Sequence, residues 1–130
     1  MIRVLIDGEG EGEVLRLTAP ISFWGGVDAA TSEIVLAGHP ERGMRVAGAV
    51  LVIPRLAGSS SSSAVMLELC RAGLAPAALI LGAADAILPV GVLAARQMGW
   101  AAPPVLAQAD LPYETGERVT VRPGGVVERG

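Results

Sequence analysis

A run of five serines is the feature of this 130-residue sequence most suited to chemistry. Gly58 precedes the serines at 59–63, which lie between a predicted strand and a predicted helix. The unpaired N–H groups and positive dipole end of a helix favour a bound anion, and the same field favours an ionised serine hydroxyl. Capping explains one serine but not five. A flexible linker is a third interpretation, but the flanking elements argue against it. The pattern therefore favours a functional serine loop.

Four other polar residues could serve a site, and each also has a structural interpretation. His39 lies in a Gly-His-Pro turn, a setting more typical of a hydrogen-bonded structural group than of a catalyst. Asp28 follows two glycines and could close an Asx turn. Arg55 precedes the serine loop, where its guanidinium could pair with a carboxylate ligand or simply face solvent. Asp85 follows a predicted strand, where it could line a ligand crevice or cap the next helix.

Composition excludes several classes of chemistry. The ten basic residues are all arginine, so a lysine Schiff base and a P-loop lysine are impossible. The formal net charge of −3 argues against a binder of nucleic-acid phosphates, which needs clustered positive charge. Cys70 is the single cysteine and cannot form an internal disulfide or hold a complete iron–sulfur cluster. With one histidine and no nucleophile elbow or triad pattern, this inventory fits half of an active site, completed by a partner.

Apolar residues make up 52% of the chain, and few of them are aromatic. Such a small domain leaves much surface exposed, so part of this apolar surface could face another protein. A well-filled core with alanine-rich helices is the alternative. Residues 74–95 form the longest apolar stretch, but prolines, glycines and Asp85 interrupt it, which disfavours a spanning helix. Residues 1–7 are too short and too soon interrupted for a signal peptide. We therefore expect a soluble cytoplasmic protein.

The elements that must position these residues follow from the hydrophobic pattern. The Gly/Glu alternation at residues 8–13 predicts a solvated turn, and the long irregular segment 18–31 is typical of a functional loop. The apolar run 46–53 predicts a strand buried on both faces. The predicted order indicates one α/β domain over residues 1–130 with a mixed sheet, in which the last two strands are edge strands. Strands are predicted at 3–7, 14–17, 33–36, 46–53, 77–81, 104–107, 119–121 and 126–127, and helices at 65–71 and 87–98.

Several segments together resemble the small subunit of the aconitase X family. The resemblance runs from about residue 8 to residue 105, and its motifs are specific in combination although each alone is weak. They are Pro20-Ile21-Ser22-Phe23-Trp24-Gly25-Gly26-Val27-Asp28, Gly38-His39-Pro40 with Gly43, Ala47-Gly48-Ala49-Val50-Leu51-Val52-Ile53-Pro54, Gly58-Ser59-Ser60 with Ser63, Glu68-Leu69, and Gly73-Leu74-Ala75-Pro76-Ala77-Ala78 with Ala84-Asp85.

The resemblance implies a swivelling β/β/α domain of aconitase type. It implies a large-subunit partner that carries an iron–sulfur cluster and most substrate contacts, so that this chain holds no metal and is inactive alone. The Gly-Ser-x-x-x-Ser loop of the family corresponds to Gly58, Ser59 and Ser63. By similarity, Ser59 is the general base. The implied substrate-binding residues are Gly58, Ser60 and Ser63, with supporting roles for Arg55, His39 and Asp28. The chain departs from the family pattern at Ser62, where a glycine is common.

The activities of the family are dehydrations. The resemblance implies a hydro-lyase that dehydrates cis-3-hydroxy-L-proline to 1-pyrroline-2-carboxylate, with Ser59 removing the proton next to the carboxylate. The Ala/Arg-rich composition is typical of a high-GC bacterial gene and favours this amino-acid substrate. The alternative within the family is the small subunit of a mevalonate 5-phosphate dehydratase. Two alternatives lie outside that activity. One is a non-catalytic interaction subunit, and the other is a swivelling domain that carries a phosphohistidine, which would need an exposed His39.

Overall fold

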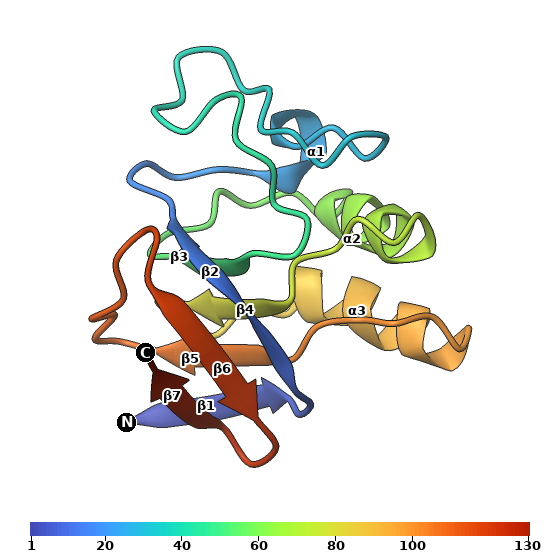
Figure 1. Cartoon of the computed structure of the whole chain (residues 1–130). Coiled ribbons are helices and arrows are strands. Elements are labelled where there is room, and N and C mark those ends of the chain that lie inside the picture. The colour runs from blue at the N-terminus through green and yellow to red at the C-terminus, as the bar shows by residue number, and fades with distance from the viewer.

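The computed structural model describes all 130 residues, and a seven-stranded mixed sheet forms its centre (Figure 1). The strand order is β1–β5–β4–β3–β2–β6–β7. The four middle strands run parallel to one another, and the outer three pair antiparallel. The strands are β1 (Ile2–Ile6), β2 (Gly10–Arg16), β3 (Val50–Ile53), β4 (Ala78–Leu81), β5 (Val105–Gln108), β6 (Arg118–Arg122) and β7 (Val126–Arg129).

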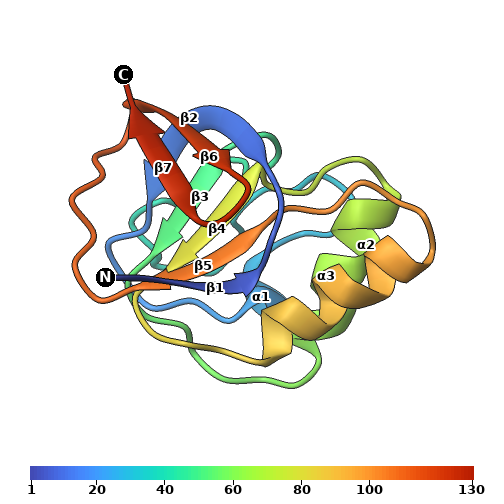
Figure 2. The same ribbon diagram turned by 90° about the horizontal axis from the view of Figure 1, so that it is seen from below.

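Two helices cover one face of this sheet, and the β6–β7 hairpin folds over the other (Figures 1 and 2). The helices are α2 (Ser62–Arg71) and α3 (Ile87–Gln97), which pack against each other. Each connects two parallel strands, because parallel neighbours need a crossover. The third helix, α1 (Phe23–Gly26), is a single turn interrupted by non-helical backbone angles at Trp24 and Gly25. The sequence prediction of an α/β fold with a mixed sheet and flanking helices is confirmed.

The sheet separates two apolar clusters, which explains the continuous apolar runs of its middle strands. In β3, Leu51 and Ile53 face the helices, whereas Val50 and Val52 face the β6–β7 hairpin. The side chains of β4 alternate in the same way. Successive residues of a strand point to opposite faces, so a strand covered on both sides is apolar at every position. The prediction of a doubly buried strand over residues 46–53 is confirmed for Val50–Ile53.

The curl of the sheet brings its two ends together. The amide of Gly124, in the turn of the β6–β7 hairpin, donates a hydrogen bond to Asp7 Oδ1 at 2.8 Å. A side chain at Gly125 would meet Val4 at 2.7 Å, so the hairpin tip lies directly on β1. The sheet therefore closes around the smaller apolar cluster, and Figure 2 shows the hairpin across the middle strands.

The prediction of a turn at residues 8–13 is wrong for residues 10–13, because β2 begins at Gly10. A Cβ at Gly10 would lie 1.9 Å from the Ala77 carbonyl oxygen, and one at Gly12 would lie 2.3 Å from that of Gly48. The glycines therefore form one face of the strand, pressed on neighbouring backbone, and the glutamates form the other. The alternation of Gly and Glu has the period of two that is typical of a strand. Glycine occupies the face of β2 that lies against neighbouring backbone.

Three other element predictions need correction. Residues 33–36 form isolated bridges, Val27 with Ile34 and Glu33 with Arg45, in place of a strand. Residues 46–49 precede β3 as turns, and β6 is an inner strand that pairs with both β2 and β7. None of the helices has the length and apolar character needed to cross a membrane.

Candidate active site

The serine loop occupies the connection from β3 to α2. The helix begins at Ser62, three residues before the predicted start, with Ser61 at the N-cap position. Ser59 and Ser60 therefore precede the helix, whereas the sequence pattern placed all five serines at its start. The loop follows the carboxyl end of a parallel strand, the edge at which open α/β sheets bind ligands.

The five serines, identical in sequence, differ in their surroundings. Ser62 is 4% exposed, and its Oγ accepts a hydrogen bond from the Trp24 amide at 3.0 Å and lies 3.1 Å from Ser22 Oγ. Ser63 Oγ donates to the carbonyl of Ser60 at 2.9 Å. The hydroxyls of the remaining three, Ser59, Ser60 and Ser61, have no hydrogen-bond partner in the chain. The structure thus leaves the first serines of the run available to a ligand.

The backbone of the same loop carries unused donors. The amides of the four residues 58–61 donate to no acceptor in the chain, although the preceding Ala57 amide donates to the Ile21 carbonyl at 2.9 Å. Successive free N–H groups before a helix form a cradle for a carboxylate or a phosphate. The loop therefore combines two kinds of free group: amides that can hold an anion and hydroxyls that can approach the atoms beside it.

His39 lies apart from this cradle and has both ring nitrogens occupied. It is 7% exposed; Nε2 lies 3.1 Å from the Ala19 carbonyl oxygen, and Nδ1 lies 3.1 Å from the Glu41 amide nitrogen. A carbonyl only accepts and an amide N–H only donates, so the neutral ring with its proton on Nε2 satisfies both contacts. His39 thus joins two loops, and the exposed ring that a phosphohistidine needs is not present.

The two aspartates that the sequence offered as site residues accept hydrogen bonds from backbone amides. Asp28 Oδ1 accepts from the Ala30 amide at 2.8 Å, which is an Asx turn. Asp85 Oδ2 accepts from the Leu88 amide at 3.0 Å and so caps the start of α3. Arg55 differs from both, because it is exposed and forms no hydrogen bond or ion pair. Of these predicted supporting residues, Arg55 alone keeps its charged group free for a ligand.

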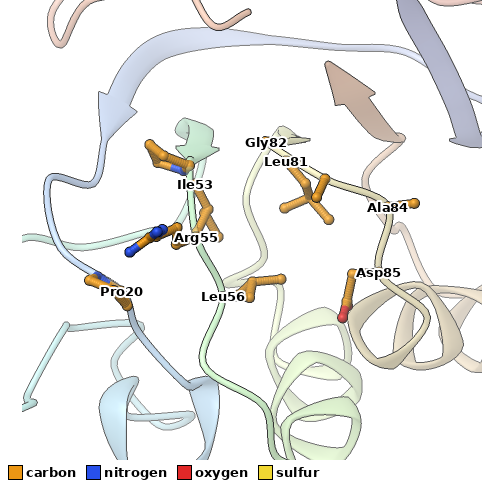
Figure 3. A pocket seen from close by; sticks show the side chains of 10 residues that line it. Pro20, Ile53, Arg55, Leu56, Leu81, Gly82, Ala84 and Asp85 are labelled. Atoms are coloured by element: carbon orange, nitrogen blue, oxygen red, sulfur yellow. The ribbon is translucent and has the colours of Figure 1, made fainter. Parts of the chain in front are cut away.

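Arg55 borders a cavity of about 460 Å³ at the carboxyl ends of β3 and β4 (Figure 3). Figure 3 shows Arg55 beside Pro20 on one side and Asp85 on the opposite side. A second cavity of about 300 Å³ lies along the Pro20 side and also has Arg55 in its wall. None of the five serines lines either cavity. The serine loop is thus an open surface outside these cavities. Such a surface would become an enclosed site if another chain covered it.

The donors of this chain do not fit an iron–sulfur cluster. Cys70 is 4% exposed on the buried face of α2, and burial raises the pKa of its thiol, whereas cluster ligation needs a thiolate. No three histidine, cysteine, aspartate or glutamate side chains come together as a metal-binding group.

Two residues of the 20–28 motif lie at the site without having been assigned a role in the sequence analysis. Ser22 and Trp24 contact Ser62, and Trp24 is 62% exposed. Their presence in the glycine-containing 20–28 motif was the available signal. Nothing local in the sequence indicated that this motif meets the serine loop, because about 40 residues separate them.

The sequence is similar to proteins of the aconitase X family. Residues 1–128 match the family model of the aconitase X swivel domain. The chain is 41% identical over 96 residues to the cis-3-hydroxy-L-proline dehydratase of Pseudomonas aeruginosa, which covers 74% of this chain. It is 37% identical over 109 residues to the same-named enzyme of Hypocrea jecorina, which covers 84% of this chain. The aligned parts are 17% and 18% of those two proteins, so the chain spans about a sixth of their length.

Shorter relatives and solved structures match over most of their length. The phosphomevalonate dehydratase small subunit of Methanothermobacter thermautotrophicus is 40% identical over 93 residues, 72% of this chain and 71% of that protein. The crystal structure of Thermococcus kodakaraensis aconitase X in its holo-form superposes with a TM-score of 0.88 at 35% identity. It covers 98% of this chain and 95% of the matched chain. The fold described above therefore recurs in that crystal structure.

Proposed function

The chain belongs to the aconitase X family, as its swivel domain, and from this premise we propose that it is the small subunit of a hydro-lyase that dehydrates cis-3-hydroxy-L-proline. The observation that carries this proposal is the serine loop, with its free hydroxyls and four free amides, in a chain whose relatives are named dehydratases. Swivel domains of this length occur in that family as separate small subunits. The free loop groups are the ones an elimination beside a carboxylate requires.

Ser59 is the proposed general base. Its hydroxyl is free, it follows Gly58, and the amides around it can hold the substrate carboxylate. The ionised Ser59 oxygen takes the proton from the carbon next to the carboxylate, the electron pair of that C–H bond forms the ring double bond, and the C–O bond of the neighbouring hydroxyl breaks. The departing hydroxide gains one proton, in net the one taken from carbon, and leaves as water, which returns Ser59 to its ionised form. The product enamine then tautomerises to 1-pyrroline-2-carboxylate. Since a serine hydroxyl is a weak base, N–H donors must stabilise its alkoxide, as they do for other oxyanions.

Gly58, Ser60 and Ser63 complete the proposed substrate-binding loop. Gly58 leaves room for a ligand, since nothing lies within 4 Å of where its Cβ would be. The Ser60 hydroxyl is free, and Ser63 holds the Ser60 carbonyl. Arg55 is placed to bind an anionic group that approaches from the cavity. His39 and Asp28 support the site indirectly through the loops that they hold.

A large subunit is the proposed partner. The family is associated with iron–sulfur chemistry, and the donors of this chain do not fit a cluster, so we assign the cluster and the remaining substrate contacts to that partner. The open serine loop is the part of this chain that the partner would close. We also propose that residues 1–130 act as one swivel domain in the cytoplasm and are inactive alone.

Mevalonate 5-phosphate is the second candidate substrate. The relatives that resemble this chain in length are phosphomevalonate dehydratase small subunits, and the free amides would accept a phosphate as well as a carboxylate. A non-catalytic subunit that only stabilises a large chain is the remaining alternative. It predicts that the free serines are dispensable.

The test is reconstitution. The chain is co-expressed with an aconitase X large subunit from the same source, and the purified pair is assayed with cis-3-hydroxy-L-proline and with mevalonate 5-phosphate. Each subunit alone is the control. Turnover of hydroxyproline by the pair alone is expected. If the pair turns over only mevalonate 5-phosphate, that compound is the substrate and hydroxyproline is not. A tight complex that is inactive on both compounds overturns the dehydratase assignment for these substrates.

A further inference from the structure

The serine loop is a span anchored at both ends on one distant segment. At its start, the Ala57 amide donates to the Ile21 carbonyl at 2.9 Å. At its end, Ser62 Oγ accepts from the Trp24 amide at 3.0 Å. Between these anchors, the amides of residues 58–61 and the hydroxyls of residues 59–61 form no hydrogen bond within the chain. The carbonyls of Ser59, Ser60 and Ser61 accept hydrogen bonds from the amides of the turn and first turn of α2.

Ser62 forms the second anchor through a buried hydroxyl. It is 4% exposed, so water does not readily replace its contacts, and Ser22 Oγ lies 3.1 Å away as a further partner. Removing this oxygen would leave the Trp24 amide without its acceptor at a part-buried position. A buried donor left without a partner costs about 1–3 kcal/mol. The loop end would then shift or loosen to satisfy that amide.

We propose that Ser62 is a positioning residue, which sets the place of Ser59 and of the loop amides by fixing the loop to the Ser22–Trp24 turn. The inference rests on the proposed function, because Ser62 acts on the same reaction through Ser59. A displacement of about 1 Å in a catalytic group can cost up to about a hundredfold in rate.

The test uses the assembled complex with three variants of this subunit. Ser62→Ala removes the acceptor, and Ser62→Thr restores an oxygen at the same atom position. Ser32→Ala is the matched control: Ser32 is also fully buried, and its Oγ accepts a single amide hydrogen bond, from Ala47 at 3.3 Å, outside the serine loop. For each variant, kcat, KM, melting temperature and hydrogen exchange of the Trp24 amide are measured.

Ser62→Ala should lower kcat about tenfold, leave KM within about twofold and speed exchange of the Trp24 amide. Ser62→Thr should recover most of the kcat. Ser32→Ala should lower the melting temperature with kcat unchanged, which separates positioning from general loss of stability. Normal kcat in a folded Ser62→Ala complex overturns the proposal, as does an equal loss of kcat in Ser32→Ala.

Failure of the proposed function has a different signature. A wild-type complex inactive on both substrates contradicts the dehydratase assignment, and the exchange measurement then decides about the anchor. Faster exchange of the Trp24 amide in Ser62→Ala supports the anchor in that case. Unchanged exchange overturns it.

Discussion

Two connections of similar length make opposite use of their polar groups. The β3–α2 connection, residues 54–61, leaves four successive amides, three hydroxyls and the Arg55 guanidinium without partners. The β5–β6 connection, residues 109–117, is tied down along its length. Arg16 donates to the Leu111 and Tyr113 carbonyls, and Tyr113 Oη donates to Gln108 at 2.7 Å. Glu117 accepts from Arg129 at 2.6 Å.

The contrast separates a segment that completes the fold from one that awaits a ligand. Polar groups used within the chain stabilise the loop that contains them, whereas free groups add nothing to stability and remain available for binding. Substitutions in the β5–β6 connection should therefore affect unfolding, and substitutions in the serine loop should affect turnover.

Ser59→Ala should lower kcat of the assembled complex by about 10²–10⁴-fold, the usual contribution of a general base. Assembly and melting temperature should not change, because the Ser59 hydroxyl has no partner in the chain. Steady-state kinetics with size-exclusion chromatography check both points. Ser60→Ala is the matched variant and should cost less. If Ser60→Ala abolishes turnover while Ser59→Ala does not, the base lies one residue later. Full activity of both variants would contradict a catalytic role for these serines and support the non-catalytic alternative.

Arg16→Met should lower the free energy of unfolding by about 2–3 kcal/mol, because two carbonyls lose a charged donor. The kcat per folded complex should stay near the wild-type value. Denaturant unfolding of the complex and kinetics on the same preparation are the measurements. Arg3→Met is the control, since Arg3 is exposed and without partners. Equal stability of Arg16→Met and Arg3→Met would contradict the structural role of the connection.

Arg55→Met should raise KM about tenfold with little change in kcat, because the variant loses the contact between the guanidinium and an anionic group of the substrate. A tenfold change in binding corresponds to about 1.4 kcal/mol. Stability should not fall, since Arg55 has no partner to lose. Arg42→Met removes the same charge from another exposed arginine without a partner and should leave KM unchanged. Equal KM shifts in both variants would indicate a general charge effect in place of a contact.

Tyr113→Phe should lower stability by about 1 kcal/mol at neutral pH through loss of the Gln108 hydrogen bond. Burial raises the pKa of the Tyr113 phenol above its ordinary value of about 10. The folded state therefore holds this proton more tightly than the unfolded state, and stability is lost as pH rises from about 10 through the folded pKa. Chemical denaturation between pH 8 and 11 should show a steeper loss in wild type than in Tyr113→Phe. Parallel curves would contradict this coupling.

The main features of the fold were predictable because they depend on local pattern. The runs at Val50–Ile53 and Ala78–Leu81 are apolar at every position, which is the pattern of parallel strands covered on both faces. The helical patterns at residues 65–71 and 87–98 located α2 and α3, although α2 begins three residues earlier than predicted. Failures occurred where backbone contact replaced side-chain pattern, as at Gly10 and Gly12. Glycine in β2 is required by the carbonyls of distant residues, which no local pattern reveals.

The candidate site was predictable only as a segment. The sequence indicated a serine loop after a buried strand, and the resemblance selected Ser59 within it. Five identical residues carry no pattern that separates them, so which serine is buried was not predictable. His39 and Asp28 were offered both as supporting site residues and as structural groups, and the structure shows their side chains bonded to backbone.

The alternation of strands and helices, the absence of lysine and the presence of one cysteine follow from composition and periodicity, which are properties of the chain alone. Which polar groups are used and which are free depends on the packing of the folded chain. Ser62 is used because Trp24, 38 residues away, places an amide against it. The Ser59 hydroxyl is free because no hydrogen-bonding group of the folded chain is placed to pair with it. Hydrogen-bond partners so far apart in sequence meet only after the sheet and helices have packed.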